Sequence, residues 1–110
     1  MKKIILIIIV SAWFNNAHAK AMDGSMALAF CKEAINCALI ASSYSDGFSY
    51  ALMALHAENT TYCIPANAST GLLGRIFKQY LIDNPDKLHY TAASLAVNAF
   101  AEAFPCKEST

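Results

Sequence analysis

Apolar residues recur at three- and four-residue spacing along four stretches of the chain, with polar residues between them. This spacing places the apolar side chains on one face of an α-helix. The stretches cover residues 26–34, 37–57, 70–82 and 85–104. No stretch of useful length alternates apolar and polar residues as a strand does. The pattern therefore predicts an all-α domain, a compact orthogonal bundle of four to five short helices.

Capping residues and prolines mark the ends of these helices. Side chains of Ser, Thr and Asn accept hydrogen bonds from the free N–H groups of a first turn, and proline fits the first helical position. The predicted caps are Ser25, Ser69 or Thr70, Asn84 ahead of Pro85, and Thr91 as a second start for the last helix. Pro105 is expected to end that helix immediately before Cys106.

The two N-terminal helices are expected to bury one apolar face each. The predicted buried positions are Met26, Ala27, Phe30 and Cys31 in the first helix, and Leu39, Ile40, Tyr44, Phe48, Ala51, Leu52 and Leu55 in the second. Gly47 interrupts the second helix, where a glycine costs about 1 kcal/mol relative to alanine. We expect that another helix crosses closely at Gly47, because only a glycine permits the shortest approach. The alternative is that Gly47 breaks the helix.

The first 19 residues have the composition of a signal peptide. Two lysines are followed by an almost wholly apolar run, residues 4–14, and the small residues Ala17 and Ala19 form a typical cleavage site. The apolar run is shorter than a membrane-spanning helix needs. Residues 20–110 are therefore expected to form a single exported domain, which does not associate with a membrane after cleavage.

The charge of the chain argues against one class of partner, and its size indicates how the fold is stabilised. The whole chain has 8 basic and 8 acidic residues, and cleavage removes Lys2 and Lys3, so the exported domain carries a small net negative charge. No basic patch appears in it, and nucleic-acid binding is excluded on that ground. A chain of this length buries only a small core, so additional cross-links are expected to stabilise it.

Export to an oxidising compartment permits the four cysteines, Cys31, Cys37, Cys63 and Cys106, to form disulfides. Cys63 and Cys106 lie beside prolines at the edges of predicted loops, so they are the favoured pair. Cys31 and Cys37 would lie about 9–10 Å apart at Cα in an unbroken helix, whereas a disulfide needs less than about 7 Å. They are a possible second pair only if the chain bends around residues 35–36. The alternative is that all four cysteines stay reduced and buried.

The residue patterns contain no recognisable catalytic, metal or cofactor site. A catalytic cysteine requires a base such as histidine, and nothing in the sequence places His56 or His89 beside a thiol. His56 is instead predicted at a helix end. Zinc sites use closely spaced pairs of cysteine or histidine, and Cys31 and Cys37 are too widely spaced for that motif. The residues alone therefore predict a binding protein, not an enzyme, with no metal and no cofactor.

A series of short motifs runs through the second half of the chain. The motifs are Tyr62-Cys63-Ile64-Pro65, Tyr80-Leu81, Asn84-Pro85, His89 and Ala103-Phe104-Pro105-Cys106, with Gly47-Phe48 in an earlier helix. Together they resemble the type VI secretion amidase immunity proteins over about residues 44–106. The chain departs from the family pattern at Ser45, where many relatives have a cysteine. The second disulfide therefore cannot be carried over from the relatives.

The resemblance implies a periplasmic immunity protein. Such a protein binds a peptidoglycan amidase delivered by neighbouring cells and inhibits it by blocking its active-site cleft, and relatives are commonly homodimers. A rigid loop loses little conformational entropy on binding, so two polar loops are candidate contacts with the cognate amidase. They consist of Glu58, Asn59, Thr60 and Thr61, and of Asp83, Asn84, Asp86 and Lys87.

Two other classes of function remain open from the sequence. The many apolar residues also fit a small exported helical carrier that encloses an apolar ligand. A small exported enzyme with an unrecognised site is the other alternative. Both candidate loops are also compatible with being solvated connections that contact no partner.

Overall fold

The computed structural model describes residues 21–107, so the predicted signal peptide, residues 1–19, lies outside the described residues. Four α-helices and one short 3-10 helix occupy most of this range. They are α2 (Gly24–Phe30), α3 (Ala34–Ala54), α4 (Thr70–Asp83), η1 (Pro85–Lys87) and α5 (Ala92–Ala103). Within residues 21–107 the extended pairing consists of one isolated bridge, between Asp23 and Thr91. The predicted all-α fold of four to five helices is confirmed.

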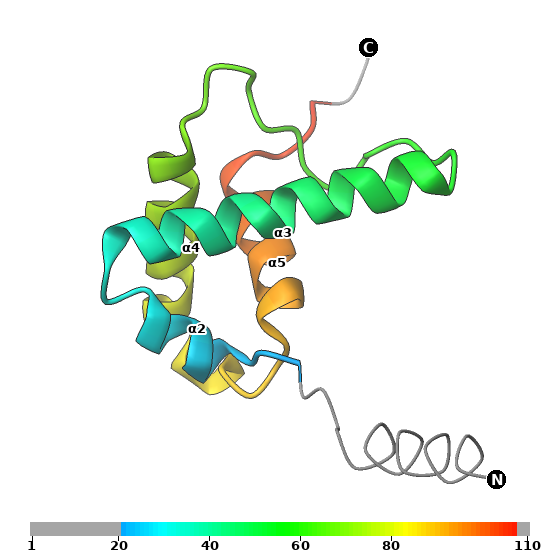
Figure 1. Cartoon of the computed structure of the whole chain (residues 1–110). Coiled ribbons are helices and arrows are strands. Elements are labelled where there is room, and N and C mark those ends of the chain that lie inside the picture. Colours follow the sequence, from blue (N-terminus) through cyan, green and yellow to red (C-terminus); the bar gives the residue numbers. More distant parts are fainter. Residues whose placement is uncertain (1–20, 108–110) are drawn as a thin grey trace, which may run out of the picture.

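The longest helix, α3, organises the arrangement of the others. In Figure 1 it lies across α4 and α5, and α2 lies near the η1 segment that connects those two helices. The first residues of the described chain are held there, because Gly24 N–H donates to the Tyr90 carbonyl and Ser25 N–H donates to that of Leu88. The last turns of α3 extend past α5 in the same view. The C-terminal end of α3 therefore projects from the bundle.

The core lies where α3 crosses α4 and α5. Phe77 of α4 and Phe100 of α5 are fully buried, and so are Leu81 and Leu95. The ring of Tyr44 on α3 meets the edge of Phe77, with ring centroids 6.2 Å apart. Burial of one large apolar side chain contributes about 1.5–3 kcal/mol, so this crossing supplies much of the stability of a small domain.

The close helix crossing is at Gly74 of α4 rather than at Gly47 of α3. A methyl group on Gly74 would lie 2.8 Å from the Cα and N atoms of Ala38. No atom lies within 4 Å of the same position on Gly47. The prediction for Gly47 is therefore wrong, because the middle of α3 turns that residue toward solvent.

The first helix is shorter than predicted, since the chain turns at residues 31–33. Asp23, and not Ser25, is its N-cap, and the carboxylate of Asp23 accepts a hydrogen bond of 2.9 Å from the N–H of Met26. The turn brings Cys31 and Cys37 to a Cα distance of 4.4 Å, and the two form a disulfide. The bend that permits this pair thus precedes the expected position at residues 35–36.

The later helix boundaries agree better with the predicted caps. Ser69 and Thr91 cap α4 and α5 with hydrogen bonds of 3.1 and 3.3 Å to backbone N–H groups. Asn84 does not cap a helix start with its side chain. Its amide donates instead to the carbonyl of Tyr80 at 2.8 Å, which closes the end of α4, and Pro85 then begins η1.

A second disulfide joins Cys63 to Cys106, with a Cα distance of 4.9 Å. The N–H of Cys63 also donates to the Phe104 carbonyl at 2.8 Å. The structure thus contains the pair that the sequence favours. This cross-link attaches the segment after α3 to the end of α5.

Several side chains that were predicted in the core are exposed. Met26 and Phe30 are nearly half exposed, Leu39 is 60% exposed and Leu55 is 75% exposed; Ala51 is exposed as well. Leu39 lies on the face of α3 opposite the core, and Leu55 lies beyond the part of α3 that crosses α4 and α5. The predicted inner face of α3 is therefore correct only in part, for Ile40, Tyr44, Phe48 and Leu52.

The projecting end of α3 closes with backbone hydrogen bonds. The N–H of His56 donates to the Met53 carbonyl at 3.1 Å, and the N–H of Ala57 donates to the Leu52 carbonyl at 2.9 Å. This is the Schellman pattern of a helix end. His56 occupies its left-handed position with a φ of 54°, so it is a helix-end residue as predicted.

Candidate partner-binding surfaces

The first candidate loop, Glu58–Thr61, directly follows the projecting end of α3. Glu58, Thr60 and Thr61 are exposed, and Asn59 is half-buried. The Asn59 side-chain oxygen accepts hydrogen bonds from the N–H groups of Thr61 at 3.1 Å and Tyr62 at 3.3 Å. Such a turn restricts the backbone of a loop tip, so this loop presents its polar side chains on an ordered backbone.

Tyr62 and Cys63 anchor this loop to the bundle. The Tyr62 ring is buried and stacks on Phe48 of α3, with centroids 5.2 Å apart, and meets the edge of Phe100 of α5 at 5.5 Å. The next residue, Cys63, forms the disulfide to Cys106. An aromatic cluster and a covalent bond therefore fix the C-terminal end of the loop.

The hydroxyl of Tyr62 is buried without a hydrogen-bond partner among the described residues. Burial raises the pKa of Tyr62, and the Asp46 carboxylate raises it as well. The Ser45 hydroxyl lies close enough to lower that pKa, but its geometry does not make a hydrogen bond to the Tyr62 oxygen. A buried hydroxyl without a partner costs free energy relative to its solvated state. The Tyr62 ring thus stabilises the fold by packing, whereas its buried hydroxyl oxygen destabilises it.

We therefore expect Tyr62→Phe to leave the free energy of unfolding unchanged or to raise it by up to about 1 kcal/mol. The ring contacts with Phe48 and Phe100 stay, and only the unpaired oxygen is removed. Urea denaturation of both proteins measures the difference. Phe48→Leu, which removes the stacked ring and leaves the hydroxyl, is the control and should destabilise. A loss above about 1 kcal/mol for Tyr62→Phe would mean that the hydroxyl has a stabilising partner.

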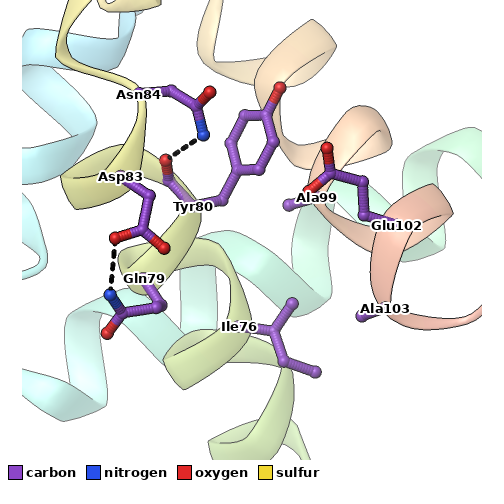
Figure 2. Close-up of a pocket in the computed structure, with 8 residues that line it drawn as sticks. All are labelled: Ile76, Gln79, Tyr80, Asp83, Asn84, Ala99, Glu102 and Ala103. Atoms are coloured by element: carbon purple, nitrogen blue, oxygen red, sulfur yellow. Dashed lines mark hydrogen bonds between the residues drawn. The ribbon is translucent and has the colours of Figure 1, made fainter.

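The second candidate loop, Asp83–Lys87, borders a hollow of mixed polar and apolar lining between α4 and α5. Figure 2 shows the hollow, which has a volume of about 290 Å³ and is lined by Ile76, Gln79, Tyr80, Asp83, Asn84, Ala99, Glu102 and Ala103. Gln79 donates to the Asp83 carboxylate at 2.8 Å, within α4 itself. Asp86 is exposed and Lys87 is half-buried in η1. The loop thus contributes Asp83 and Asn84 to the lining of the hollow.

The structure does not bring the two candidate loops together. The segment 58–61 is followed by Cys63, which is bonded to Cys106 after the C-terminal end of α5. The segment 83–87 precedes the N-terminal end of α5 and lies near α2, as Figure 1 shows. The two loops therefore belong to opposite ends of α5 and form two separate surfaces.

An apolar surface that the sequence reading missed lies on the outer face of α3. Ile35, Leu39, Tyr50 and Met53 are each between 60% and 73% exposed. Their helical spacing was available in the sequence. It was overlooked because the larger set of apolar residues on the same helix was assigned to a single buried face, which took in Leu39.

The cysteines and histidines that could serve in catalysis or metal binding can be located among the described residues. All four cysteines are in disulfides, so none is a free nucleophile. The ring of His89 packs against Tyr90, with centroids 4.2 Å apart, and both residues are exposed. Within residues 21–107, no three His, Cys, Asp or Glu side chains gather as a metal site, and no helix is long and apolar enough to span a membrane.

Comparison with known proteins gives a match to one family. The family described as Rap1a immunity proteins matches residues 23–106, which is well over half of the chain. The matched region includes α2 to α5, both disulfides and both candidate loops. No curated protein and no solved structure matches the chain.

Proposed function

The chain belongs to the Rap1a immunity proteins, a type VI secretion immunity family, and on that basis we propose that it inhibits a peptidoglycan amidase effector in the periplasm. The proposed inhibitor binds the cognate amidase and blocks its active-site cleft. It performs no catalysis itself. The family match over residues 23–106 is the observation that carries this proposal.

We propose the loop Glu58–Thr61 as the main contact with the amidase. The bonds of Asn59 and the anchoring of Tyr62 and Cys63 order this loop before binding. An ordered loop loses less conformational entropy when it enters a cleft. The exposed Leu55 precedes the loop and supplies an apolar anchor beside polar side chains, a combination typical of protein interfaces.

The loop Asp83–Lys87 is the second proposed contact. Its exposed Asp83 and Asp86 make it acidic, and an acidic segment favours a partner surface that carries basic residues. Because it lies at the other end of α5 from Glu58, one cleft of modest size would accommodate only one of the two loops. The two contacts are therefore separable by mutation.

The signal peptide at residues 1–19, the single exported domain at residues 20–110 and the homodimer are parts of the same proposal. Two disulfides in the described residues support export, since disulfides persist in oxidising compartments such as the periplasm. Mass spectrometry of protein recovered from the periplasm tests whether the signal peptide is cleaved after residue 19. An N-terminus at Lys20 is the expected result.

Charge reversal tests the amidase contacts. We expect Glu58→Lys to raise the dissociation constant for the cognate amidase at least tenfold, about 1.4 kcal/mol, because a contact at the centre of an interface would be replaced by a repulsive one. Asp86→Lys is expected to have a smaller effect, through a rim contact. Isothermal titration calorimetry with the purified amidase measures both affinities.

Glu33→Lys is the matched control for these variants. It makes the same change of charge on an exposed residue immediately before α3, at the opposite end of that helix from Glu58. Its affinity for the amidase should equal that of the unmodified protein. If neither Glu58→Lys nor Asp86→Lys weakens binding, the two loops are not the contact surface. If the unmodified protein fails to bind and inhibit the amidase, the proposed function itself is wrong.

A further inference from the structure

The hollow between α4 and α5 combines an apolar and a charged part. Its volume of about 290 Å³ lies just below the range of about 300–1,000 Å³ that is typical of pockets for small molecules. Ile76, Ala99 and Ala103 make up the apolar part of the lining, and the carboxylates of Asp83 and Glu102 belong to the polar part. A hollow of this size and composition suits one long side chain with an apolar stem and a charged end.

The charge of the hollow favours a cation. Asp83 ends α4 and Glu102 lies in the last turn of α5, so each helix contributes one carboxylate. None of the residues that line the hollow is basic, and a bound cation would therefore be attracted by both carboxylates. A metal ion fits less well, because the described part of the chain has no group of three His, Cys, Asp or Glu side chains that could hold one.

Tyr80 is a second, independent sign of a ligand at this hollow. Its side chain is only 6% exposed, and Figure 2 shows its ring extending from α4 toward α5, between Asp83 and Glu102. The backbone carbonyl of Tyr80 accepts a hydrogen bond from Asn84, but its hydroxyl has no partner within residues 21–107. Polar groups on buried side chains normally have a partner, so this hydroxyl is available to a ligand in the hollow.

The amide side chains beside the hollow direct N–H groups at protein acceptors. Gln79 donates to one oxygen of the Asp83 carboxylate at 2.8 Å, which leaves the second oxygen of that carboxylate for a ligand. Asn84 donates to the Tyr80 carbonyl at 2.8 Å, which leaves the amide oxygen of Asn84. Together with Glu102, these oxygens make the hollow rich in acceptors, so it favours a ligand that carries many donors.

We propose that this hollow binds the guanidinium group of an arginine side chain that the partner amidase presents. A guanidinium carries five N–H donors in one plane, no acceptor and a permanent charge. Its planar fork suits acceptors that are spread over two helices, whereas the ammonium of lysine is a compact, strongly hydrated point charge. Naming the amidase as the source of the arginine rests on the proposed function, but the guanidinium site itself does not.

Titration with a capped arginine, followed by nuclear magnetic resonance, tests the guanidinium site without the amidase. The probe is N-acetyl-arginine methylamide, and the same derivative of citrulline, which has nearly the same shape but no charge, is its control. We expect the capped arginine to shift the backbone amide signals of Ile76, Tyr80 and Ala99. The capped citrulline should bind about tenfold more weakly or less, and added salt should weaken arginine binding because it screens the carboxylates.

Variants of nearly unchanged shape assign the binding to this hollow. Tyr80→Phe removes only the hydroxyl, so thermal unfolding should stay the same while affinity for the capped arginine falls about three- to tenfold, the effect of one lost hydrogen bond. Asp83→Asn and Glu102→Gln together remove both charges and should lower that affinity about tenfold or more. Glu33→Gln is the matched control, because Glu33 is an exposed carboxylate outside the hollow, and it should change nothing.

Calorimetry with the purified amidase tests the source of the arginine. The double variant of Asp83 and Glu102 should raise the dissociation constant for the amidase about tenfold or more. The absence of shifts with capped arginine, equal binding of capped citrulline, or arginine binding that the double variant retains overturns the guanidinium site. Arginine binding that the double variant loses without any change in amidase affinity overturns the amidase as the source. If the unmodified protein binds no amidase, the proposed function fails, and capped arginine alone decides on the site.

Discussion

Replacing Cys63 and Cys106 together with serine is expected to lower the free energy of unfolding by about 4 kcal/mol. The disulfide between them closes a loop of the chain with a sequence separation of 43 residues. Closing a loop of that length removes conformational entropy from the unfolded chain, and the chain-entropy relation gives about 4 kcal/mol. A loss of that size approaches the whole stability of many small domains. We therefore expect the variant to be partly unfolded at 37 °C.

Guanidinium denaturation of oxidised protein measures this loss, and the other disulfide supplies the comparison. Cys31 and Cys37 are only 6 residues apart, for which the same relation gives about 2.4 kcal/mol. Replacing that pair with alanine should therefore cost less through loop closure, although these two cysteines are also buried. A loss below about 1 kcal/mol for the Cys63 and Cys106 variant would contradict the loop-closure account.

Gly74→Ala is expected to lower the free energy of unfolding by about 3 kcal/mol. The added methyl group would meet the backbone of Ala38 at 2.8 Å. Backbone atoms of a helix cannot turn aside as the end of a side chain can, so α3 and α4 have to separate. Overpacking of a core costs about 1–3 kcal/mol, and the upper end of that range applies when two helices must move.

Gly47→Ala is the matched control, and the opposite sign is expected. Gly47 lies in the middle of α3 with open space at its Cβ position. Alanine is favoured over glycine in a helix by about 1 kcal/mol, so this variant should be more stable than the unmodified monomer. Thermal unfolding of both variants measures the two effects. Equal effects of the same sign would mean that α4 does not cross α3 closely at Gly74.

The local signals in the sequence predicted much of this fold. Ser69 as the cap of α4 and Thr91 as the cap of α5 follow from short-range chemistry, since a hydroxyl serves the N–H groups of the next turn wherever the helix lies. The pairing of Cys63 with Cys106 followed from their positions at loop edges. The apolar spacing over residues 70–82 was sufficient to place α4, because that helix has one buried face, which includes Leu73, Phe77 and Leu81.

The errors arose where a distant segment decides the outcome. Gly47 and Gly74 look alike in the sequence, and only the crossing with Ala38 distinguishes them. Helix α3 carries apolar residues on two faces, and periodicity alone does not tell which face meets α4 and α5. Leu39 was assigned to the core for that reason. Sequence reasoning found the polar loop at Glu58–Thr61 from its composition, but it missed the exposed apolar residues on the outer face of α3.

The two disulfides hold the pieces of the chain together after some protease cuts but not after others. Neither disulfide spans residues 38–62, because one ring ends at Cys37 and the other begins at Cys63. A single cut at the exposed end of α3, near Leu55, would leave two pieces without a covalent link. A cut in the connection at residues 84–90 would leave the pieces joined through Cys63 and Cys106. Resistance to proteolysis therefore depends most on the exposed end of α3 near Leu55. A partner that covers this end would protect it from cleavage.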